Sequence, residues 1–448
     1  MMRGKNEPII LPCSAPIGIL LYKISQYSST FELTKGFFIA LLSSGFIYLN
    51  HWGFSYPLLN TILGITALYL LLREGKKVWF ISGAFIGLFW FWWIALSFKH
   101  YGMVWAVPIE IAIIMLCYGV LFWLVAWISQ KITSLLQISD TLLPLLIKAS
   151  GLCILSYIHP FSFDWLKPEL MFVESYLGIE KWQYAIILSA IVLSIWKQQF
   201  LYMLLMLFAY QVHLPTHLKA DDKIRADDKI KLVTTHTSVQ DKWDETLHPA
   251  QFENLFKQID QAIKENKTLI ILPESVFPIF LNRSKLLDKL QEKAKDISIV
   301  TGGLYWDGKT PRNSTYVFTG NKISVANKVV LVPFGESNPL PDFLSEWVNK
   351  VFYDGAVDYV ASPNVIDYKI DEKTYRNAIC FEATSEKLYE GEPKNMIVLS
   401  NNGWFTPSIE PTLQKLLLQY YSRKYGTTIY HSVNMSESYV VKNGEVDQ

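Results

Sequence analysis

Charged residues are distributed very unevenly along this chain of 448 residues. Residues 1–217 hold only 22 of its 81 Asp, Glu, Lys and Arg residues, about 10% of that half, and long apolar stretches lie between them. Residues 218–448 hold the other 59, about 26%, which is ordinary for a water-soluble domain. The pattern predicts a membrane half followed by a soluble half.

The apolar stretches of the first half are spaced like membrane-spanning helices. A helix that crosses a bilayer needs about 20 mostly apolar residues. About seven stretches approach this length, at 34–50, 55–72, 78–98, 104–130, 141–160, 182–196 and 199–215. Aromatic residues gather near their ends, as in an interfacial belt, and include Trp52, Tyr56, Trp79, Trp90, Trp92, Trp93, Trp105 and Trp127. We therefore expect a multi-span helical bundle.

Two parts of this first half need separate treatment. Only Lys197 and Gln198 separate 182–196 from 199–215, and one continuous helix there would leave six spans and a cytoplasmic second half. Such a helix would have 34 residues and would greatly exceed the bilayer, so two spans are the better prediction. Pro12 and Pro16 interrupt the apolar stretch 9–21, which lacks a cleavage site, and we expect a peripheral or disordered leader rather than a signal peptide.

The basic residues of the short loops indicate an orientation, because cytoplasmic loops carry an excess of Lys and Arg. With the N-terminus inside, nine basic residues fall on the inner side: Arg3, Lys5, Lys23, Lys35, Arg73, Lys76, Lys77, Lys131 and Lys197. Three fall on the outer side: Lys99, Lys167 and Lys181. Seven spans would then deliver residues 218–448 to the outer face of a bacterial inner membrane.

Several ionisable residues lie in or beside the expected spans. Lys148 is inside the fifth stretch, where a charge is a functional hypothesis by default, although snorkelling is the commoner explanation. Glu110 is similar, and neither residue receives a role. The segment 157–182 contains His159, Asp164, Trp165, Glu169 and Glu174; it is too polar to span, so we expect it at the outer surface.

The second half begins with a polar linker at 218–229 and continues as a domain at 230–448. Apolar strands are expected at 230–236, 268–272, 297–301, 314–319, 323–327, 364–369, 376–380 and 396–400. Helices are expected at 248–265, 283–295 and 410–425. This alternation is typical of an α/β fold.

Three short motifs in this domain carry chemically capable side chains. Glu274 stands in I-I-L-P-E-S-V-F-P, Lys328 in N-K-V-V-L-V-P-F-G-E and Cys380 in A-I-C-F-E. The first and last follow apolar strands, and strand ends are where an α/β sheet places chemistry. A thiol attacks as thiolate and needs a base, while an ammonium stabilises a negative oxygen. Taken singly, each residue is more commonly a core cysteine, a solvated glutamate or a surface lysine.

The order acid, lysine, thiol resembles that of the nitrilase superfamily. L-V-P-F-G-E, K-W-D-E at 242–245 and S-N-N-G-W-F at 400–405 resemble the apolipoprotein N-acyltransferase family, which places a multi-span bundle ahead of its nitrilase domain. The resemblance implies an α-β-β-α sandwich for the second half. It implies Glu274 as general base, Lys328 as oxyanion stabiliser and Cys380 as nucleophile.

The resemblance also implies supporting residues. Glu336 matches a carboxylate that positions the lysine or shuttles a proton, and Glu382 and Asn401 match residues that shape the pocket. Apolar side chains should line an entrance for lipid, and the candidates are Trp404 and Phe405, Phe343 to Trp347, and Phe352 and Tyr353.

The chain departs from the family pattern at four places. Phe381 stands where Tyr is usual, Asn402 where Asp is usual and Asn327 where His is usual. The family also places a last transmembrane helix after the nitrilase domain, whereas residues 426–448 are polar. All three catalytic side chains are nevertheless present.

The resemblance implies an enzyme that moves an acyl chain from a glycerophospholipid, through a thioester, to the N-terminal amine of diacylglyceryl-cysteine in a lipoprotein. A membrane-anchored amidase with water as acceptor is the alternative enzyme. A non-enzymatic scaffold would have no use for Glu, Lys and Cys together.

No cofactor is expected, because a Gly-rich phosphate loop is missing. The four cysteines (Cys13, Cys117, Cys153 and Cys380) show no zinc-site spacing, so no metal is expected either. The net charge of +1 gives no support for nucleic-acid binding.

Overall fold

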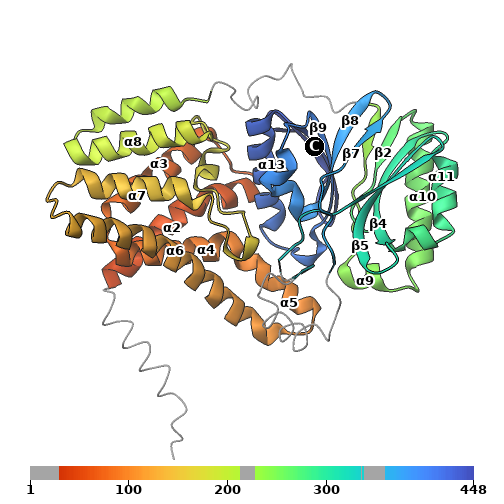
Figure 1. Cartoon of the computed structure of the whole chain (residues 1–448), viewed down its shortest axis with the longest axis horizontal. Coiled ribbons are helices and arrows are strands. Elements are labelled where there is room, and N and C mark those ends of the chain that lie inside the picture. The colour runs from red at the N-terminus through yellow and green to blue at the C-terminus, as the bar shows by residue number, and fades with distance from the viewer. Residues whose placement is uncertain (1–29, 212–227, 334, 338–358, 448) are drawn as a thin grey trace, which may run out of the picture.

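The computed structural model describes residues 30–211, 228–333, 335–337 and 359–447. Figure 1 shows two parts lying side by side, a helical bundle built from the first of these segments and a pair of β-sheets with covering helices built from the others. The expected leader at 9–21 and most of the linker at 218–229 lie outside the described residues.

The bundle has helices at each of the predicted apolar stretches. They are α2 (Thr30–His51), α3 (Pro57–Arg73), α4 (Lys76–Phe91) with η1 (Trp92–Leu96) and α5 (Ser97–His100), η2 (Val104–Ala106) with α6 (Val107–Leu135), α7 (Leu142–Leu155), α8 (Lys181–Lys197) and η5 (Phe200–Ala209). Within the described residues, four segments are long and apolar enough to cross a membrane: Thr30–His51, Lys76–His100, Val104–Leu135 and Leu142–Ser162. Helices α3 and η5 are apolar but shorter.

The chain reverses between α8 and η5 instead of continuing as one helix. Gln198 caps α8 in a left-handed conformation with φ of 54°, which ends the helical hydrogen-bond pattern. The following 3₁₀ segment then packs back along α8. The number of these helices that cross the bilayer stays a prediction.

The second part contains two six-stranded sheets in the described residues. The first has the order β1-β2-β4-β5-β6, with β3 paired to β4. Its strands are β1 (Ile230–Leu232), β2 (Leu269–Ile271), β3 (Phe277–Phe280), β4 (Ser298–Trp306), β5 (Pro311–Thr319) and β6 (Lys322–Asn327). The second has the order β12-β11-β10-β9-β8-β7. Its strands are β7 (Asp367–Ile370), β8 (Lys373–Ile379), β9 (Asn395–Asn401), β10 (Thr428–Asn434), β11 (Tyr439–Lys442) and β12 (Glu445–Asp447).

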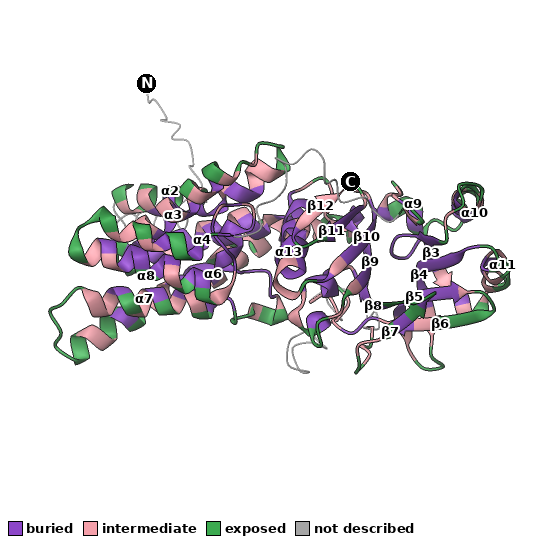
Figure 2. Ribbon diagram, turned by 90° about the horizontal axis from the view of Figure 1, so that it is seen from above, coloured by how far each residue is buried: buried purple, intermediate pink, exposed green. Residues whose placement is uncertain are grey.

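The two sheets pack face to face between two layers of helices, as Figure 2 shows. Strand β9 explains the arrangement, because it is apolar on both faces. Ile397 and Leu399 point into the core between the sheets, while Met396 and Val398 point toward α13 (Glu410–Tyr425). Helices α10 (His248–Lys264) and α11 (Leu286–Lys293) cover the outer face of the first sheet. The predicted α-β-β-α sandwich behind a helical bundle is confirmed.

The hydrophobic core of the bundle continues without a break into this sandwich. One cluster of buried side chains runs from α2 and α4 through the segment 163–179 to α13 and the outer face of the second sheet. Phe381 of the sandwich stacks on Phe163 and Trp165 of the bundle, at ring-centroid distances of 5.6 and 6.1 Å. The bundle and the sandwich therefore share packing instead of being joined only by the linker.

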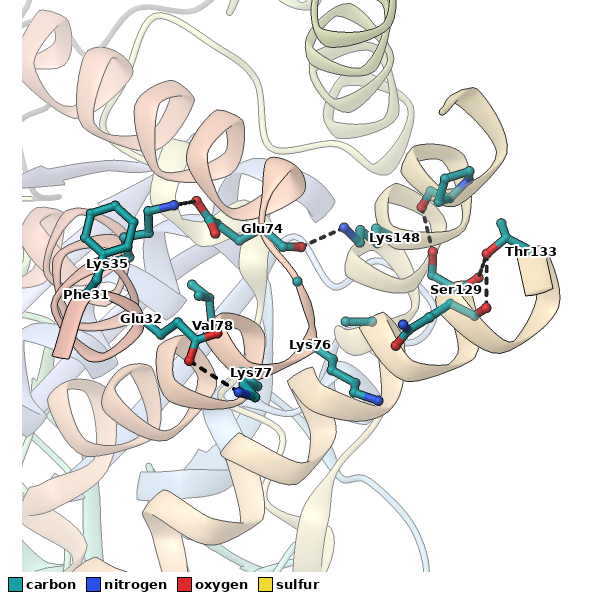
Figure 3. Close-up of a pocket in the computed structure, with 14 residues that line it drawn as sticks. Phe31, Glu32, Lys35, Glu74, Lys76, Lys77, Val78, Ser129, Thr133 and Lys148 are labelled. Carbon is teal, nitrogen blue, oxygen red and sulfur yellow. Dashed lines mark hydrogen bonds and ion pairs between the residues drawn. The ribbon is translucent and has the colours of Figure 1, made fainter. Parts of the chain in front are cut away.

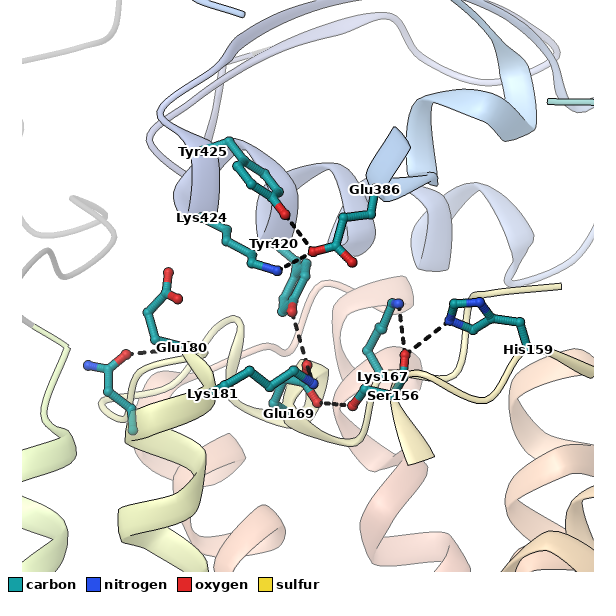
Figure 4. Close-up of polar contacts among 11 residues, drawn as sticks. Ser156, His159, Lys167, Glu169, Glu180, Lys181, Glu386, Tyr420, Lys424 and Tyr425 are labelled. Carbon is teal, nitrogen blue, oxygen red and sulfur yellow. Dashed lines mark hydrogen bonds and ion pairs between the residues drawn. The ribbon is translucent and has the colours of Figure 1, made fainter. Parts of the chain in front are cut away.

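Much of the segment 157–182 is buried against α13, and its position at the outer membrane surface stays a prediction. Glu169 is fully buried and accepts hydrogen bonds from Ser156 Oγ (2.6 Å), Lys181 Nζ (2.5 Å) and Tyr420 Oη (2.9 Å) (Figure 4). Tyr420 belongs to α13, so the network joins the two parts of the molecule. Satisfied hydrogen bonds allow these polar side chains to be buried.

Residues 426–447, which the sequence analysis describes only as polar, form the strands β10, β11 and β12. The polar side chains of β10 are buried because they bind backbone groups and neighbouring side chains. Ser432 Oγ donates to the carbonyl oxygens of Val233 (2.7 Å) and Ile271 (3.0 Å) in and beside the first sheet. Asn434 Nδ2 donates to the oxygens of Thr237 and Asn401. Strand β3 was also not predicted.

Candidate active site

Cys380 lies at a sharp turn between β8 and a 3₁₀ helix, η7 (Cys380–Thr384). Its backbone has φ of 53°, in the left-handed region that a side chain with a Cβ rarely adopts. Strained residues of this kind gather at functional sites, and a strand–turn–helix corner presents a nucleophile at the end of a sheet. The local backbone thus gives Cys380 the setting of a nucleophile.

Glu274 lies just beyond β2, in a turn whose next residue, Ser275, also has positive φ (48°). The turn packs directly against Gly302 of β4. A Cβ at that glycine would collide with the backbone nitrogen of Ser275, so the close approach requires glycine. Glu274 is 7% exposed, and its carboxylate therefore faces the protein interior.

Lys328 follows β6, and hydrogen bonds fix its own backbone and that of the two residues after it. Its backbone N–H donates to the carbonyl oxygen of Asn313 at 2.9 Å. The carboxylate of Glu382 accepts hydrogen bonds from the next two backbone N–H groups, Val329 (2.7 Å) and Val330 (3.0 Å), and from Ile379 (2.8 Å). Since Ile379 directly precedes Cys380, Glu382 links the lysine segment to the turn that carries Cys380.

Glu336 and Asn313 complete the polar part of the site. Glu336 Oε2 lies 2.7 Å from Lys328 Nζ, and it also accepts a hydrogen bond from Val332 N at 2.9 Å. Asn313 Nδ2 donates to Glu274 Oε1 (2.8 Å) and to Glu336 Oε1 (3.0 Å). The lysine thus pairs with Glu336, and Asn313 fixes the distance between the two carboxylates.

The contact between Lys328 and Glu336 is an ion pair rather than an aligned hydrogen bond. Among the described residues, no acceptor lies at hydrogen-bonding geometry to Lys328 Nζ, although the ammonium is fully enclosed. A buried donor normally has an acceptor. An ammonium has three N–H donors, and those not directed at Glu336 can bind a negative oxygen that forms on a substrate.

Burial and the neighbouring charges shift the pKa values of both Cys380 and Glu274. Burial and the neighbouring Glu274 raise the pKa of the Cys380 thiol well above its usual value, more than Lys328 lowers it. Burial likewise raises the pKa of Glu274, against the lowering influence of Lys328. The thiol therefore rests protonated, and a carboxylate with a raised pKa is a stronger base for removing its proton.

Lys328 stays cationic despite its burial. Burial alone would lower its pKa, but Glu336, Glu274, Cys380 and Glu382 together raise it above the usual range. Burial raises the pKa of Glu382 to about 7, while Lys328 and the three backbone N–H groups lower it.

Two residues of this site were missed by the sequence analysis. Asn313 lies on β5 in an unremarkable N-S-T segment, with no signal that it contacts two carboxylates. Lys242, the first residue of K-W-D-E, is 2% exposed and donates to the carbonyl oxygen of Glu274 at 3.2 Å. Burial lowers the pKa of Lys242 to about 8, although Glu274 and Cys380 raise it. The motif signalled Lys242, but the sequence analysis gave it no role.

Asn401 and Trp404 lie at the end of β9 and just beyond it, and Trp404 contacts the bundle. Asn401 ends β9, and its Oδ1 accepts hydrogen bonds from Asn434 Nδ2 (2.7 Å) and Gly403 N (3.3 Å). Trp404 packs edge-on against His100 and stacks on Tyr101, with ring centroids 5.2 and 5.9 Å away. His100 Nε2 also lies 3.2 Å from the Trp404 carbonyl oxygen. A loop of the bundle therefore forms part of the wall beside the site.

The three residues that depart from the family pattern each contact a side chain compatible with them. Phe381 stacks on bundle aromatics, where a hydroxyl is not needed. Asn402 donates from Nδ2 to Ser436 Oγ at 3.1 Å, and Asn327 Oδ1 accepts from Ser314 Oγ at 2.7 Å.

Several predictions fall on other parts of the chain. The entrance candidates Phe343 to Trp347 and Phe352 and Tyr353 lie outside the described residues. Phe405, which with Trp404 is one of the described candidates, packs edge-on against Trp93 of the bundle at 4.8 Å. In the described parts of the chain, no group of three or more His, Cys, Asp or Glu side chains could hold a metal ion.

Comparison with known proteins decides the family. The family described as the apolipoprotein N-acyltransferase integral membrane domain matches residues 30–214. The apolipoprotein N-acyltransferase of Wolinella succinogenes is 39% identical, over 90% of this chain and 94% of the relative. The Helicobacter pylori enzyme of the same name is 35% identical, over 91% of this chain and 95% of its own.

This chain belongs to the apolipoprotein N-acyltransferase family. It is a multi-pass membrane protein, and family membership supports N-acyltransferase activity. The predicted resemblance is confirmed. A CN-hydrolase superfamily protein from Xanthomonas campestris is a structural neighbour at TM-score 0.38 and 12% identity, covering 49% of this chain and 84% of that protein.

Proposed function

We propose that this member of the apolipoprotein N-acyltransferase family moves an acyl chain from a glycerophospholipid to the N-terminal amine of a diacylglyceryl-cysteine lipoprotein. Cys380 is the nucleophile, Glu274 the general base and Lys328 the oxyanion stabiliser. Glu336 and Glu382 position the lysine, and Asn401 and Trp404 shape the pocket. The observation that carries the proposal is a strained, half-buried thiol beside a buried carboxylate and a buried ammonium.

The first half-reaction loads the enzyme. Glu274 takes the thiol proton while Cys380 Sγ attacks the ester carbonyl carbon of the phospholipid. The ammonium of Lys328 stabilises the negative oxygen that forms, which is often worth about 3 kcal/mol per donor. The carbon–oxygen bond then breaks, and the departing lysophospholipid oxygen receives the proton from Glu274. An acyl thioester on Cys380 remains.

The second half-reaction transfers the acyl group from Cys380 to the amine. An α-amine has a pKa near 7.7–8.0, so it is partly neutral at physiological pH and can attack the thioester carbonyl carbon. Lys328 stabilises the negative oxygen again. The carbon–sulfur bond breaks, and the amine proton passes through Glu274 to the thiolate. The products are an amide and the resting thiol.

Contact with the bundle favours this transferase over an amidase. The nucleophile turn packs on Phe163 and Trp165, and the wall residue Trp404 packs on His100 and Tyr101. A site at the membrane surface suits two lipid substrates, whereas a hydrolase of small amides has no need of it. Water as the acceptor remains the second candidate because the same three side chains could serve it.

We also propose the topology expected from the basic loops. Residues 1–217 form the membrane part with about seven spans, 218–229 a tether and 230–448 the catalytic part, on the outer face of a bacterial inner membrane. Alkaline phosphatase fused after Gln448 should be active, because it needs an oxidising compartment for its disulfides. A stable but inactive fusion would place the catalytic part in the cytoplasm.

Thioester loading tests the reaction. The purified full chain mixed with phospholipid alone should accumulate an acyl group on Cys380 that neutral hydroxylamine releases. Adding a diacylated peptide with a free N-terminal amine should convert it to a triacylated amide, detected by mass spectrometry. Discharge by water as fast as by peptide would favour the amidase, and no thioester at all would refute both.

Matched variants assign the roles. Cys380→Ser and Glu274→Gln should fail to load, because the nucleophile or its base is lost. Lys328→Arg should lower the rate by about 10² or more, since a planar guanidinium cannot replace one compact ammonium. The control replaces the bundle cysteines, Cys117→Ala with Cys153→Ala, and should load normally.

A further inference from the structure

A cavity of about 670 Å³ opens at one end of the bundle (Figure 3). It lies between the start of α2, the α3–α4 loop, the end of α6 and the start of α7. Four lysines contribute to its lining: Lys35, Lys76, Lys77 and Lys148. Apolar side chains, among them Phe31 and Val78, line it as well.

The cavity is at the opposite end of the bundle from the sandwich. Helix α2 begins beside the cavity at Thr30 and ends at His51, whose Nδ1 lies 2.9 Å from Thr412 Oγ1 of α13. Its 22 residues span about 33 Å at 1.5 Å per residue, about the thickness of a bilayer's hydrocarbon core. The cavity is therefore separate from the acyl-transfer site and faces the other leaflet.

The cavity has more positive than negative charge. Glu74 pairs with Lys35 at 2.6 Å, and Glu32 lies 3.6 Å from Lys77. Lys148 Nζ donates to the carbonyl oxygens of Leu72 (3.1 Å) and Glu74 (2.7 Å), which position the ammonium without neutralising it.

Lys76 remains available for a ligand. It is exposed, and within the described parts of the chain no carboxylate pairs with it. It is also the first residue of α4, whose N-terminus no described side chain caps. The two uncompensated cations, Lys76 and Lys148, therefore face one cavity together with free helix N–H groups, which favours an anion.

We propose that this cavity binds the phosphate headgroup of an anionic phospholipid in the leaflet opposite the catalytic part. Lys76 and Lys148 contact the phosphate, and the apolar side chains contact the start of the acyl chains. A volume of 670 Å³ is within the range of ligand sites and suits a headgroup. Basic pockets between membrane helices recognise lipid headgroups in this way.

Binding of phosphatidylglycerol to the full chain in neutral detergent tests the proposal, measured by native mass spectrometry. Phosphatidylglycerol should bind more tightly than phosphatidylcholine, and added salt should weaken it. Lys76→Gln should weaken binding about fivefold, the usual effect of one basic residue near a lipid surface. Lys148→Gln should weaken it at least as much, and thermal unfolding without lipid shows whether that variant is folded.

The matched control is Lys131→Gln, which removes an exposed charge from α6 at the same end of the bundle but outside the cavity lining. It should leave the affinity unchanged. An equal loss in Lys131→Gln would show general attraction to a basic surface and would overturn the proposal. Soluble glycerol phosphate that binds as tightly as the lipid would also overturn it, because the site would then recognise free phosphate.

Discussion

Replacing Glu382 by Gln would test the link between the lysine and the nucleophile. The buried carboxylate accepts two backbone N–H groups after Lys328 on one oxygen and the N–H of Ile379 on the other. Gln has the same shape, but one of its terminal atoms is a donor. Whichever way the amide turns, at least one backbone N–H would face another N–H.

The size of the effect follows from these three bonds. A hydrogen bond to a charged acceptor contributes about 1.5–3 kcal/mol, and one to a neutral acceptor about half as much. Losing one bond and halving the other two should therefore cost about 3–6 kcal/mol. If about 3 kcal/mol of this cost appears as transition-state stabilisation that a displaced Lys328 no longer provides, the loading rate falls by about 10².

The assay measures the rate of thioester formation on Cys380 against phospholipid concentration, with thermal unfolding in the same detergent. A positioning role predicts a lower maximal rate with little change in the phospholipid concentration at half-maximal rate. The control is Glu386→Gln, four residues along the chain, because the side chain of Glu386 is 42% exposed and should tolerate the change. Loading by Glu382→Gln at the unaltered rate would refute the reasoning.

Three further substitutions test other contacts. Tyr420→Phe removes a hydrogen bond to a buried carboxylate of the bundle and should lower stability by about 1.5–3 kcal/mol in denaturant unfolding; Tyr421→Phe, whose hydroxyl has no partner among the described residues, should change it by less than about 0.5 kcal/mol. Asn313→Ala removes a hydrogen bond that lowers the pKa of Glu274, so the acid limb of the loading rate should move to higher pH, and an unmoved limb would contradict the assignment of the base. Folding lowers the pKa of Lys242 from 10.5 to about 8, so between these pH values the unfolded chain binds more protons than the folded one. The free energy of unfolding should therefore rise by about 3 kcal/mol from pH 8 to 10.5, and Lys242→Met should remove that rise.

The elements that sequence could predict are those whose pattern is local. Strand β9 is a short run of apolar residues with a neighbour to bury on each face, and the helices of the bundle are long apolar runs. The motifs around Glu274, Lys328 and Cys380 are local too, and the structure places all three in one region of the sandwich.

What could not be predicted depends on distant partners. Asn313 binds carboxylates 39 and 23 residues away, and no property of its own segment indicates them. Strand β10 contains His431, Ser432 and Asn434, which look like loop residues until the first sheet supplies acceptors for Ser432. Polar segments of this kind are buried only because the rest of the fold provides their hydrogen bonds.

The aromatic contact between Phe381 and the bundle has a practical consequence for inhibitor discovery. A soluble fragment containing only the sandwich would be convenient for screening, but it would leave Phe381 without Phe163 and Trp165. The turn that carries the thiol would then lie on a surface newly exposed to water, and the ring next to the thiol would lose the aromatic packing that helps to hold the turn in place. Compounds selected against such a fragment would be fitted to a differently placed sulfur, so screening should use the intact chain in detergent or nanodiscs.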